Sequence, residues 1–307
     1  MSKVQSINNR PSVAMIGFGE AGSAFAEGWG QRSPIAAVYD KQLDASDAGL
    51  AMQNKIDAAN LSSSPNASEA VQNKDVVFSF VTADQALAAT QSAVKTLKPN
   101  ALYFDCNSCA PDTKRQSAQL VEAAGARYVD VAIMAPVHPA LHKTKVHISG
   151  PHTEAAEAVM KALDMKVTIL EGDVGTASAT KMVRSIMMKG LEALMLECVL
   201  AGREAGVDEL VLDSLEQTYP DFGWKERAHY NLERVMVHGK RRAAEMREVA
   251  TTVEQLGLPN VMSTATVNWQ DRIGNLELDP NYELANEDYQ TRADIILNAL
   301  KPQKTNP

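Results

Sequence analysis

Four apolar residues run directly into a glycine-rich turn near the start of the chain, in the stretch VAMIGFGEAG at positions 13–22. Its glycines follow the spacing Gly-X-Gly-X-X-Gly. In such a turn the first glycine, Gly17, permits a sharp bend and the second, Gly19, lets another molecule approach the bare backbone. The third, Gly22, lets a following helix pack closely against the strand. The stretch therefore predicts a strand, a tight turn and a helix, in that order.

The residues after this turn favour a dinucleotide as the bound molecule. Residues 21–29 read as a helix, and the N–H groups and dipole at a helix N-terminus attract phosphate. The next predicted strand ends at Asp40, near the spacing expected for an acid that binds a ribose hydroxyl. Asp40 favours NAD because a carboxylate repels a 2′-phosphate, whereas Lys41 beside it favours NADP. We expect NAD, with NADP as the alternative.

An ordinary strand–turn–helix whose glycines serve packing alone is the competing interpretation of the same residues. Thr82 joins the predicted site because it ends a later parallel strand, and ligands gather at the carboxyl edge of such sheets. The cofactor-binding residues predicted on these grounds are Gly17, Phe18, Gly19, Glu20, Ala21, Gly22, Asp40, Lys41 and Thr82.

The chain has two halves of different texture. Up to about residue 172, short apolar runs alternate with helical segments, which predicts a mostly parallel sheet covered on both faces. The expected strands are 13–16, 35–39, 76–81, 101–104, 127–131, 146–149 and 167–170, with helices that include 84–97 and 113–124. After Gly175 only helices are expected, at 176–205, 208–218, 224–250 with a possible break near Gly239, and 261–273.

The predicted fold class is therefore an α/β Rossmann-type N-terminal domain followed by an all-α C-terminal domain. We place the dinucleotide-binding domain at residues 1–173 and a helical domain, for substrate binding and dimerisation, at residues 174–307.

Composition excludes several other classes of protein. The formal net charge is −8, which argues against a nucleic-acid partner because phosphate binding needs clustered Lys and Arg. The sequence has no run of 18 apolar residues, so we expect no membrane span, and the first twelve residues have no apolar signal core. Three cysteines do not make a disulfide framework. We expect a cytoplasmic protein with no membrane partner.

Cys106 and Cys109 form a Cys-X-X-Cys pair, which is compatible with a redox role or with half of a zinc site. A structural zinc site needs a second pair of ligands, and we therefore expect no metal. The redox alternative stays open.

A second motif lies where the texture changes: GTASATK, at residues 175–181. Together with IGFGEAG, VFSFVTAD, FDCNSCAP and YVDVAIMAPV, it resembles the β-hydroxyacid dehydrogenase family, which includes 3-hydroxyisobutyrate and 6-phosphogluconate dehydrogenases. The resemblance covers nearly the whole chain. It implies a catalytic lysine at Lys181, cofactor contacts from Asn107 and Ser108 beside the nicotinamide, and a homodimer formed through the helical domains.

The chemistry of a lysine suits this role. Hydride transfer from an alcohol carbon needs a group that takes the hydroxyl proton, and the reverse reaction needs one that returns it. A lysine in a water-poor site has its pKa lowered toward neutrality and serves both directions. The competing interpretation of Lys181 is a surface lysine on an amphipathic helix.

Three departures from the family pattern leave the substrate open. The family asparagine one turn after the lysine is Ser185 here, which we expect to orient the substrate hydroxyl. The family Ser-Gly-Gly loop, whose N–H groups hold a carboxylate, is Met134-Ala135-Pro136 here, and proline has no N–H. The family Lys-Asp pair is replaced by Ala244-Glu245. The HGKRRAAEM stretch instead resembles a less characterised branch of the superfamily.

Other side chains are candidates for holding an anionic substrate. They are Arg184, Lys189, His229, Arg241 and Arg242. Trp224 ends the aromatic segment 219–224, which is either a lid that stacks on a larger substrate or a loop packed into the core. The substrate-binding residues that we predict are Met134, Ala135, Arg184, Trp224 and Arg242.

The sequence thus predicts an NAD(P)-dependent dehydrogenase that acts on the CH–OH group of a hydroxy acid or a related alcohol or polyol. The alternatives are an enzyme for a larger aromatic alcohol or an imine, and a non-catalytic NAD(P)-binding scaffold.

Overall fold

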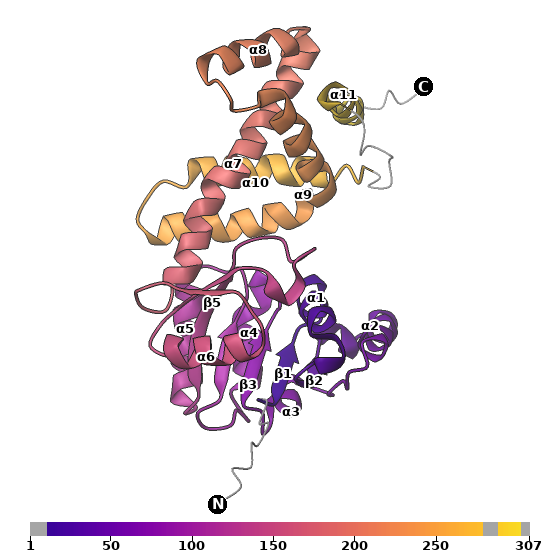
Figure 1. The fold of residues 1–307 in the computed structure, drawn as a ribbon. Coiled ribbons are helices and arrows are strands. Elements are labelled where there is room, and N and C mark those ends of the chain that lie inside the picture. The colour runs from indigo at the N-terminus through magenta and orange to yellow at the C-terminus, as the bar shows by residue number, and fades with distance from the viewer. Residues whose placement is uncertain (1–10, 279–287, 302–307) are drawn as a thin grey trace, which may run out of the picture. The chain divides into compact units, whose positions relative to one another are not determined.

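A seven-stranded sheet forms the centre of the first half of the chain (Figure 1). Its strand order is β2-β1-β3-β4-β5-β6-β7, and every neighbouring pair is parallel except β5 and β6. The strands are β1 (Val13–Ile16), β2 (Ile35–Tyr39), β3 (Val76–Ser79), β4 (Leu102–Asp105), β5 (Arg127–Ile133), β6 (Val146–Ser149) and β7 (Val167–Ile169). The structure is a computed structural model that describes residues 11–278 and 288–301.

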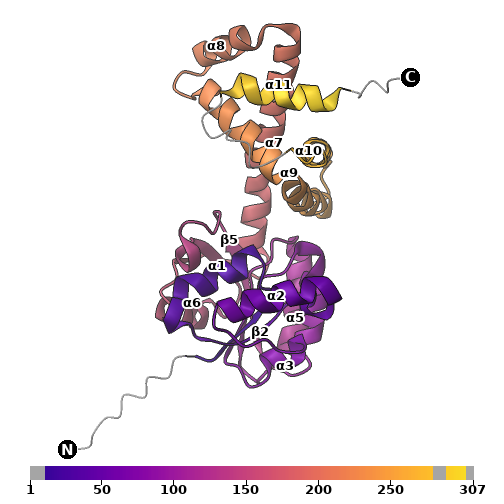
Figure 2. The same ribbon diagram turned by 90° about the vertical axis from the view of Figure 1, so that its right-hand side faces the viewer.

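Helices cover both faces of the sheet, as the buried residues show (Figure 2). One face packs on α1 (Glu20–Trp29), α2 (Ser46–Ala58) and α6 (Thr153–Ala162). The other packs on α3 (Ala67–Val71), α4 (Ala86–Ala93) and α5 (Pro111–Ala123). Short 3₁₀ turns lie at Gly30–Arg32, Lys41–Asp44, Ala83–Gln85 and Leu141–Lys143.

Alternate residues of one strand divide between the two apolar clusters. In β3, Val76 and Phe78 belong to one and Val77 to the other, because side chains alternate across a strand. This double burial explains the continuous apolar runs in the sequence, and it confirms the predicted parallel-dominated sheet. β3 ends two residues earlier than predicted because the N–H of Val81 donates to the Asn107 side chain, at 2.7 Å, instead of extending the ladder.

The second half of the described chain is helical. It contains α7 (Thr176–Ala205), α8 (Asp208–Thr218), α9 (Trp224–Gln255), α10 (Val261–Gly274) and α11 (Tyr289–Leu300). The chain divides into two compact units, residues 1–181 and 182–307, so that α7 begins in the first unit and continues in the second. Across residues 11–278 and 288–301, no helix combines the length and apolar character that crossing a membrane requires.

α9 does not end near Gly239 as a break would require, since it runs as one helix from Trp224 to Gln255, but it bends along its length (Figures 1 and 2). A Cβ atom on Gly239 would lie 2.6 Å from the carbonyl oxygen of Gln270, and one on Gly274 would lie 2.4 Å from the backbone nitrogen of Lys240. Glycine is therefore needed at this point because α9 and α10 cross with their backbones in contact, and not because the helix ends.

Candidate coenzyme and catalytic site

The glycine turn after β1 has the geometry that its spacing predicts. Gly17 has φ +90°, and a Cβ there would lie 2.4 Å from the carbonyl oxygen of Phe80, at the end of the neighbouring strand β3. A Cβ on Gly22 would lie 2.4 Å from the carbonyl oxygen of Gly17. A Cβ on Gly19, by contrast, would meet nothing within 4 Å. Bare backbone at Gly19 thus serves something other than packing within the chain.

The start of α1 is open to an anion. No side chain caps the helix at Gly19, and both Gly19 and Glu20 are exposed, while Phe18 is buried and Ala21 is half-buried. A helix N-terminus without a side-chain cap, at a glycine where an added Cβ would meet nothing, fits the pyrophosphate of a dinucleotide.

Asp40 follows β2 and is bonded to the turn. Its Oδ2 accepts a hydrogen bond from the N–H of Phe18 at 2.7 Å, and its Oδ1 accepts one from the N–H of Gln42 at 2.9 Å. Lys41, which is exposed, donates to Gln85 Oε1 at 3.0 Å. The Asp40 carboxylate is thereby held beside the glycine turn, as a ribose-binding acid requires.

Lys55 is a residue at this turn that the sequence did not identify. From the last turn of α2, its Nζ donates to the carbonyl oxygens of Phe18, at 2.9 Å, and Gly19, at 3.1 Å, and it lies 5.6 Å from the centroid of the Phe18 ring. Its position in the sequence is that of an ordinary helix lysine, and only the tertiary fold brings it to the turn.

The loops after β3 and β4 are tied together by Asn107. Its Oδ1 accepts from the N–H of Val81 and its Nδ2 donates to Ser79 Oγ at 3.0 Å, and the residue is 3% exposed. Thr82 beside them is exposed. Because β1, β3 and β4 are adjacent and parallel, these loops lie at the same edge of the sheet as the glycine turn.

Lys181 meets Ser108 at this edge. The lysine lies in the second turn of α7, and its Nζ donates to Ser108 Oγ at 2.5 Å. Both side chains are half-buried. The two residues are 73 positions apart in the sequence, and both belong to the first compact unit.

Ser185 follows Lys181 by one turn of α7, and its hydroxyl is already bonded. Lys189 Nζ donates to Ser185 Oγ at 3.2 Å and lies 2.9 Å from Glu245 Oε2. Ser185 and Lys189 are both buried. The second unit therefore holds this serine in a small polar cluster that is shared between α7 and α9.

Arg242 is paired within the second unit. It contacts both carboxylate oxygens of Glu192 at 2.8 Å, and Gln270 donates to the same carboxylate at 3.2 Å. Burial raises the pKa of Glu192, and burial lowers the pKa of Arg242. A carboxylate thus compensates the charge of this arginine, whereas Arg184 on α7 is exposed.

The remaining predicted substrate contacts lie in two places. The N–H of Met134, just after β5, donates to the carbonyl oxygen of Lys145 at 3.0 Å, and Ala135 is exposed. Trp224 begins α9, lies 4.4 Å from the ring centroid of Phe222, and packs against the apolar core of the second unit.

All three cysteines are free thiols. Cys106 and Cys109 are buried, and burial raises the pKa of the Cys106 thiol. Within the described part of the chain, no group of three or more His, Cys, Asp or Glu side chains is placed to hold a metal ion.

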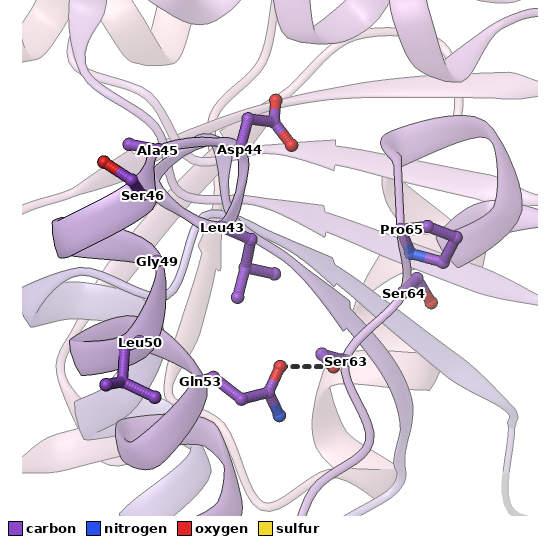
Figure 3. Close-up of a pocket in the computed structure, with 10 residues that line it drawn as sticks. All are labelled: Leu43, Asp44, Ala45, Ser46, Gly49, Leu50, Gln53, Ser63, Ser64 and Pro65. Atoms are coloured by element: carbon purple, nitrogen blue, oxygen red, sulfur yellow. Dashed lines mark hydrogen bonds between the residues drawn. The ribbon is translucent and has the colours of Figure 1, made fainter.

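A surface hollow of about 640 Å³ lies at the end of the short turn that follows Asp40 (Figure 3). It opens between the start of α2 and the segment that carries Ser63, where Gln53 Oε1 accepts a hydrogen bond from Ser63 Oγ at 2.8 Å. None of the predicted cofactor or catalytic residues lines it.

Comparison with known proteins gives the chain a family. Residues 12–172 match the NAD binding domain of 6-phosphogluconate dehydrogenase, and residues 203–273 match a domain of unknown function (DUF1932). A conserved hypothetical protein from Sinorhizobium meliloti 1021 is 31% identical, over 95% of this chain and 98% of that one, with a TM-score of 0.77.

Two further solved structures share the fold. The conserved protein MTH1747 of unknown function, described as structurally similar to 3-hydroxyacid dehydrogenases, is 27% identical over 86% of this chain and 96% of its own, with a TM-score of 0.68. A Mycobacterium tuberculosis 3-hydroxyisobutyrate dehydrogenase, solved with L-serine, is 13% identical over 94% of this chain and 99% of its own, also with a TM-score of 0.68.

The glycine turn, the sheet order and these matches agree. The chain belongs to the family of the NAD binding domain of 6-phosphogluconate dehydrogenase, as a divergent β-hydroxyacid dehydrogenase branch of the NAD(P)-dependent oxidoreductases.

Proposed function

We propose that the protein is a dehydrogenase that oxidises the CH–OH group of a small hydroxy acid or related alcohol, with Lys181 as general acid and base. The observation that carries this proposal is the contact of Lys181 Nζ with Ser108 Oγ at 2.5 Å. It puts an amine and a hydroxyl at the sheet edge where the glycine turn lies, and the expected nicotinamide-side loop supplies the hydroxyl.

The proposed residues divide the chemistry between them. Lys181, as a neutral amine, takes the proton of the substrate hydroxyl, and as an ammonium it returns that proton in the reverse direction. Ser108 holds the amine in place. A nicotinamide coenzyme would supply the acceptor for the hydride. In the second unit, Ser185 is proposed to orient the hydroxyl, with Lys189 holding the serine.

The loop after β5 supports a substrate different from that of the better-known family members. The N–H of Met134 is bonded to Lys145, and Pro136 has no N–H. This loop therefore has fewer donors for a carboxylate than a Ser-Gly-Gly loop has. We propose Arg184, the residue before Ser185 on α7, as the anchor for an anionic group. Its replacement by alanine then raises KM and leaves kcat nearly unchanged.

The main test is Lys181→Ala. We expect turnover to fall by about 10²-fold or more, because no group of matching basicity takes its place, while the dissociation constant for NADH changes little. Steady-state rates over a panel of hydroxy acids, polyols and aryl alcohols, with NADH fluorescence titration, measure both quantities.

Lys161→Ala is the matched control, since Lys161 pairs with Glu157 on the surface of α6. A Lys181→Ala enzyme that keeps its full rate contradicts the mechanism. Tight NADH binding by the wild type without oxidation of any substrate in the panel instead favours a coenzyme-binding scaffold.

The coenzyme part of the proposal has its own test. Gly19→Ala introduces a methyl group that meets nothing in the chain, so it leaves the fold intact and obstructs the pyrophosphate. We expect NADH affinity to fall by about tenfold or more with little change in thermal unfolding. Gly190→Ala, where the nearest atom to the new Cβ is 3.9 Å away, is the control, and equal affinities in the two variants contradict the placement.

We propose NAD as the preferred coenzyme because the Asp40 carboxylate is held at the turn. Asp40→Ala is expected to weaken NAD more than NADP. Equal losses of affinity for the two coenzymes in fluorescence titrations would contradict a contact between Asp40 and the ribose.

We also propose a cytoplasmic homodimer. Three free cysteines fit a reducing setting. Val183, Met187 and Leu194 leave an exposed apolar stripe on α7, at the spacing of one helix face. Light scattering after size exclusion is expected to give twice the chain mass for the wild type and the mass of a single chain for Met187→Glu.

A further inference from the structure

Three fully buried charged side chains lie together in the first unit. Asp105 and Asp130 are paired residues on β4 and β5, and Lys114 comes from α5. All three are 0% exposed. Lys114 Nζ donates to Asp105 Oδ1 at 2.9 Å, to the carbonyl oxygen of Asp105 at 2.6 Å and to that of Val131 at 3.5 Å.

The carboxylate of Asp130 also lies beside the Lys114 ammonium. Asp130 Oδ1 accepts no hydrogen bond from the described residues, and Lys114 Nζ lies 3.6 Å from it. Burial by itself lowers the pKa of Lys114, but Asp105, Cys109 and Asp130 outweigh this effect and raise it. The lysine is therefore charged, and one cation compensates two anions. Burying three ions is costly. The backbone segments that the two carboxylates bond are therefore of interest.

Asp130 holds the start of the helix that carries Lys181. Its Oδ2 accepts from the N–H of Gly175 at 3.1 Å, from the N–H of Ser178 at 3.0 Å and from Ser178 Oγ at 3.2 Å. Ser149 Oγ donates to the same oxygen at 3.2 Å and accepts from the N–H of Ala177 at 3.0 Å. The first turn of α7 is thus capped by β5 and β6, and Lys181 lies one turn further on.

Asp105 holds the loop that carries Ser108. Its Oδ1 accepts from the N–H of Asn107 at 3.1 Å, and its Oδ2 accepts from the hydroxyl of Tyr128 at 2.7 Å. Ser108 is the next residue after Asn107. Each partner of the Lys181–Ser108 pair is therefore attached to its own buried carboxylate, and both carboxylates face Lys114.

We propose that Lys114 is a positioning residue, which sets the Lys181–Ser108 pair by holding Asp105 and Asp130 together. The role rests on the proposed function of Lys181, since its purpose is to place that amine for proton transfer. A shift of either carboxylate moves the first turn of α7 against the loop after β4. Small displacements of a reacting group reduce rates strongly.

Lys114→Met tests this role because methionine keeps a similar length and removes the charge. We expect kcat per bound NADH to fall by about tenfold or more, with KM and the NADH dissociation constant within about twofold of wild type. Counting sites by NADH titration removes any loss of folded protein from the comparison. An unchanged kcat per bound NADH, in a protein whose Lys181→Ala variant is slow, overturns the proposal.

A second variant serves if Lys114→Met does not fold. Lys114→Met with Asp105→Asn removes one buried cation and one buried anion, so the net buried charge is that of the wild type, and it keeps Asp130 as the helix cap. The same fall in kcat is expected, measured against Asp105→Asn alone. A double variant as fast as Asp105→Asn contradicts a role for Lys114.

A measurement without coenzyme or turnover separates this proposal from the proposed function. Reductive methylation with ¹³C labels exposed lysines and not the fully buried Lys114, and Lys181→Arg identifies the Lys181 signal in NMR spectra. We expect Lys114→Met to shift or broaden that signal, and Lys161→Met on α6 to leave it unchanged.

The two results are independent. An unshifted Lys181 signal overturns the positioning role, whatever Lys181→Ala does to turnover. A shifted signal in a protein whose Lys181→Ala variant remains fully active upholds the positioning role and removes the lysine from the mechanism.

Discussion

The two units bury charges in different ways. In the first, Asp105, Lys114 and Asp130 are wholly inside, and the two carboxylates accept from backbone N–H groups of a loop and of a helix start. In the second, the pair of Glu192 with Arg242 joins side chains of neighbouring helices. Its arginine side chain is 12% exposed.

The difference separates two uses of the same chemistry. Side-chain-to-backbone bonds fix where a segment of chain lies, whereas side-chain pairs between helices hold elements whose own backbone bonds are already complete. Charges that hold backbone are therefore expected to be costlier to remove and more closely tied to activity. The predictions below run from the largest expected effect to the smallest.

Lys114→Met and Arg242→Met form a matched pair across the two units. Removing one partner of a fully buried ion network costs about 3–5 kcal/mol of unfolding free energy, and we expect this for Lys114. For Arg242 we expect about 1–3 kcal/mol, because water reaches part of the side chain. Urea unfolding followed by the fluorescence of Trp29 in the first unit, and of Trp224 and Trp269 in the second, measures the two losses separately. Equal losses remove the distinction.

The crossing of α9 and α10 tests packing without charge. Gly274→Ala places a Cβ 2.4 Å from the backbone nitrogen of Lys240, and we expect a cost of about 1–3 kcal/mol in the second unit. Gly190→Ala, in the open middle of α7, is expected to be neutral or to stabilise by up to about 1 kcal/mol. If the two variants have the same free energy of unfolding, the contact between the α9 and α10 backbones is not the reason for glycine at position 274.

Acid affects one carboxylate in each unit with opposite sign. In the first unit, Lys98 and Ser12 lower the pKa of Asp75 to about 2, so its contribution is present above its ordinary pKa and is lost as the pH falls toward 2. In the second unit, burial raises the pKa of Glu192. The folded protein then takes up a proton first, and this group adds stability as the pH falls through its raised pKa.

Asp75→Asn and Glu192→Gln are expected to flatten these two responses. The Asp75 effect should be under about 1 kcal/mol, because the side chain is 45% exposed and water screens its charge. Thermal unfolding from pH 7 to pH 3 measures both. A Glu192→Gln protein with the acid response of the wild type contradicts the effect assigned to burial.

Local patterns predicted much of the fold. The limits of β1, β2, β6, α7 and α8 agree with the predicted ranges, because apolar runs, helix periodicity and Gly206 after α7 are all read within a few neighbouring residues. Gly239 misled the prediction because its reason is Gly274, on another helix. A glycine that ends a helix and one that lets a second helix approach look alike in sequence.

Local patterns predicted part of the site as well, and missed the contacts between distant residues. The glycine spacing located the turn after β1, and GTASATK placed Lys181 near a helix start. The contact of Lys181 with Ser108, the approach of Lys55 to the turn and the pairing of Arg242 with Glu192 depend on residues 36 to 73 positions apart. Spacing within a motif carries no information about such partners. The predicted cofactor and substrate contacts remain predictions to be tested by binding and turnover.

The helices α3 and α11 are capped by the side chain of the residue just before them, Asn66 and Asp288, but α7 takes its cap from Asp130, 45 and 48 positions upstream of the amides it bonds. The first turn of this helix therefore becomes stable only after β5 has joined the sheet. A growing or partly unfolded chain therefore cannot hold Lys181 beside Ser108, and that contact forms only once Asp130 and the start of α7 have come together.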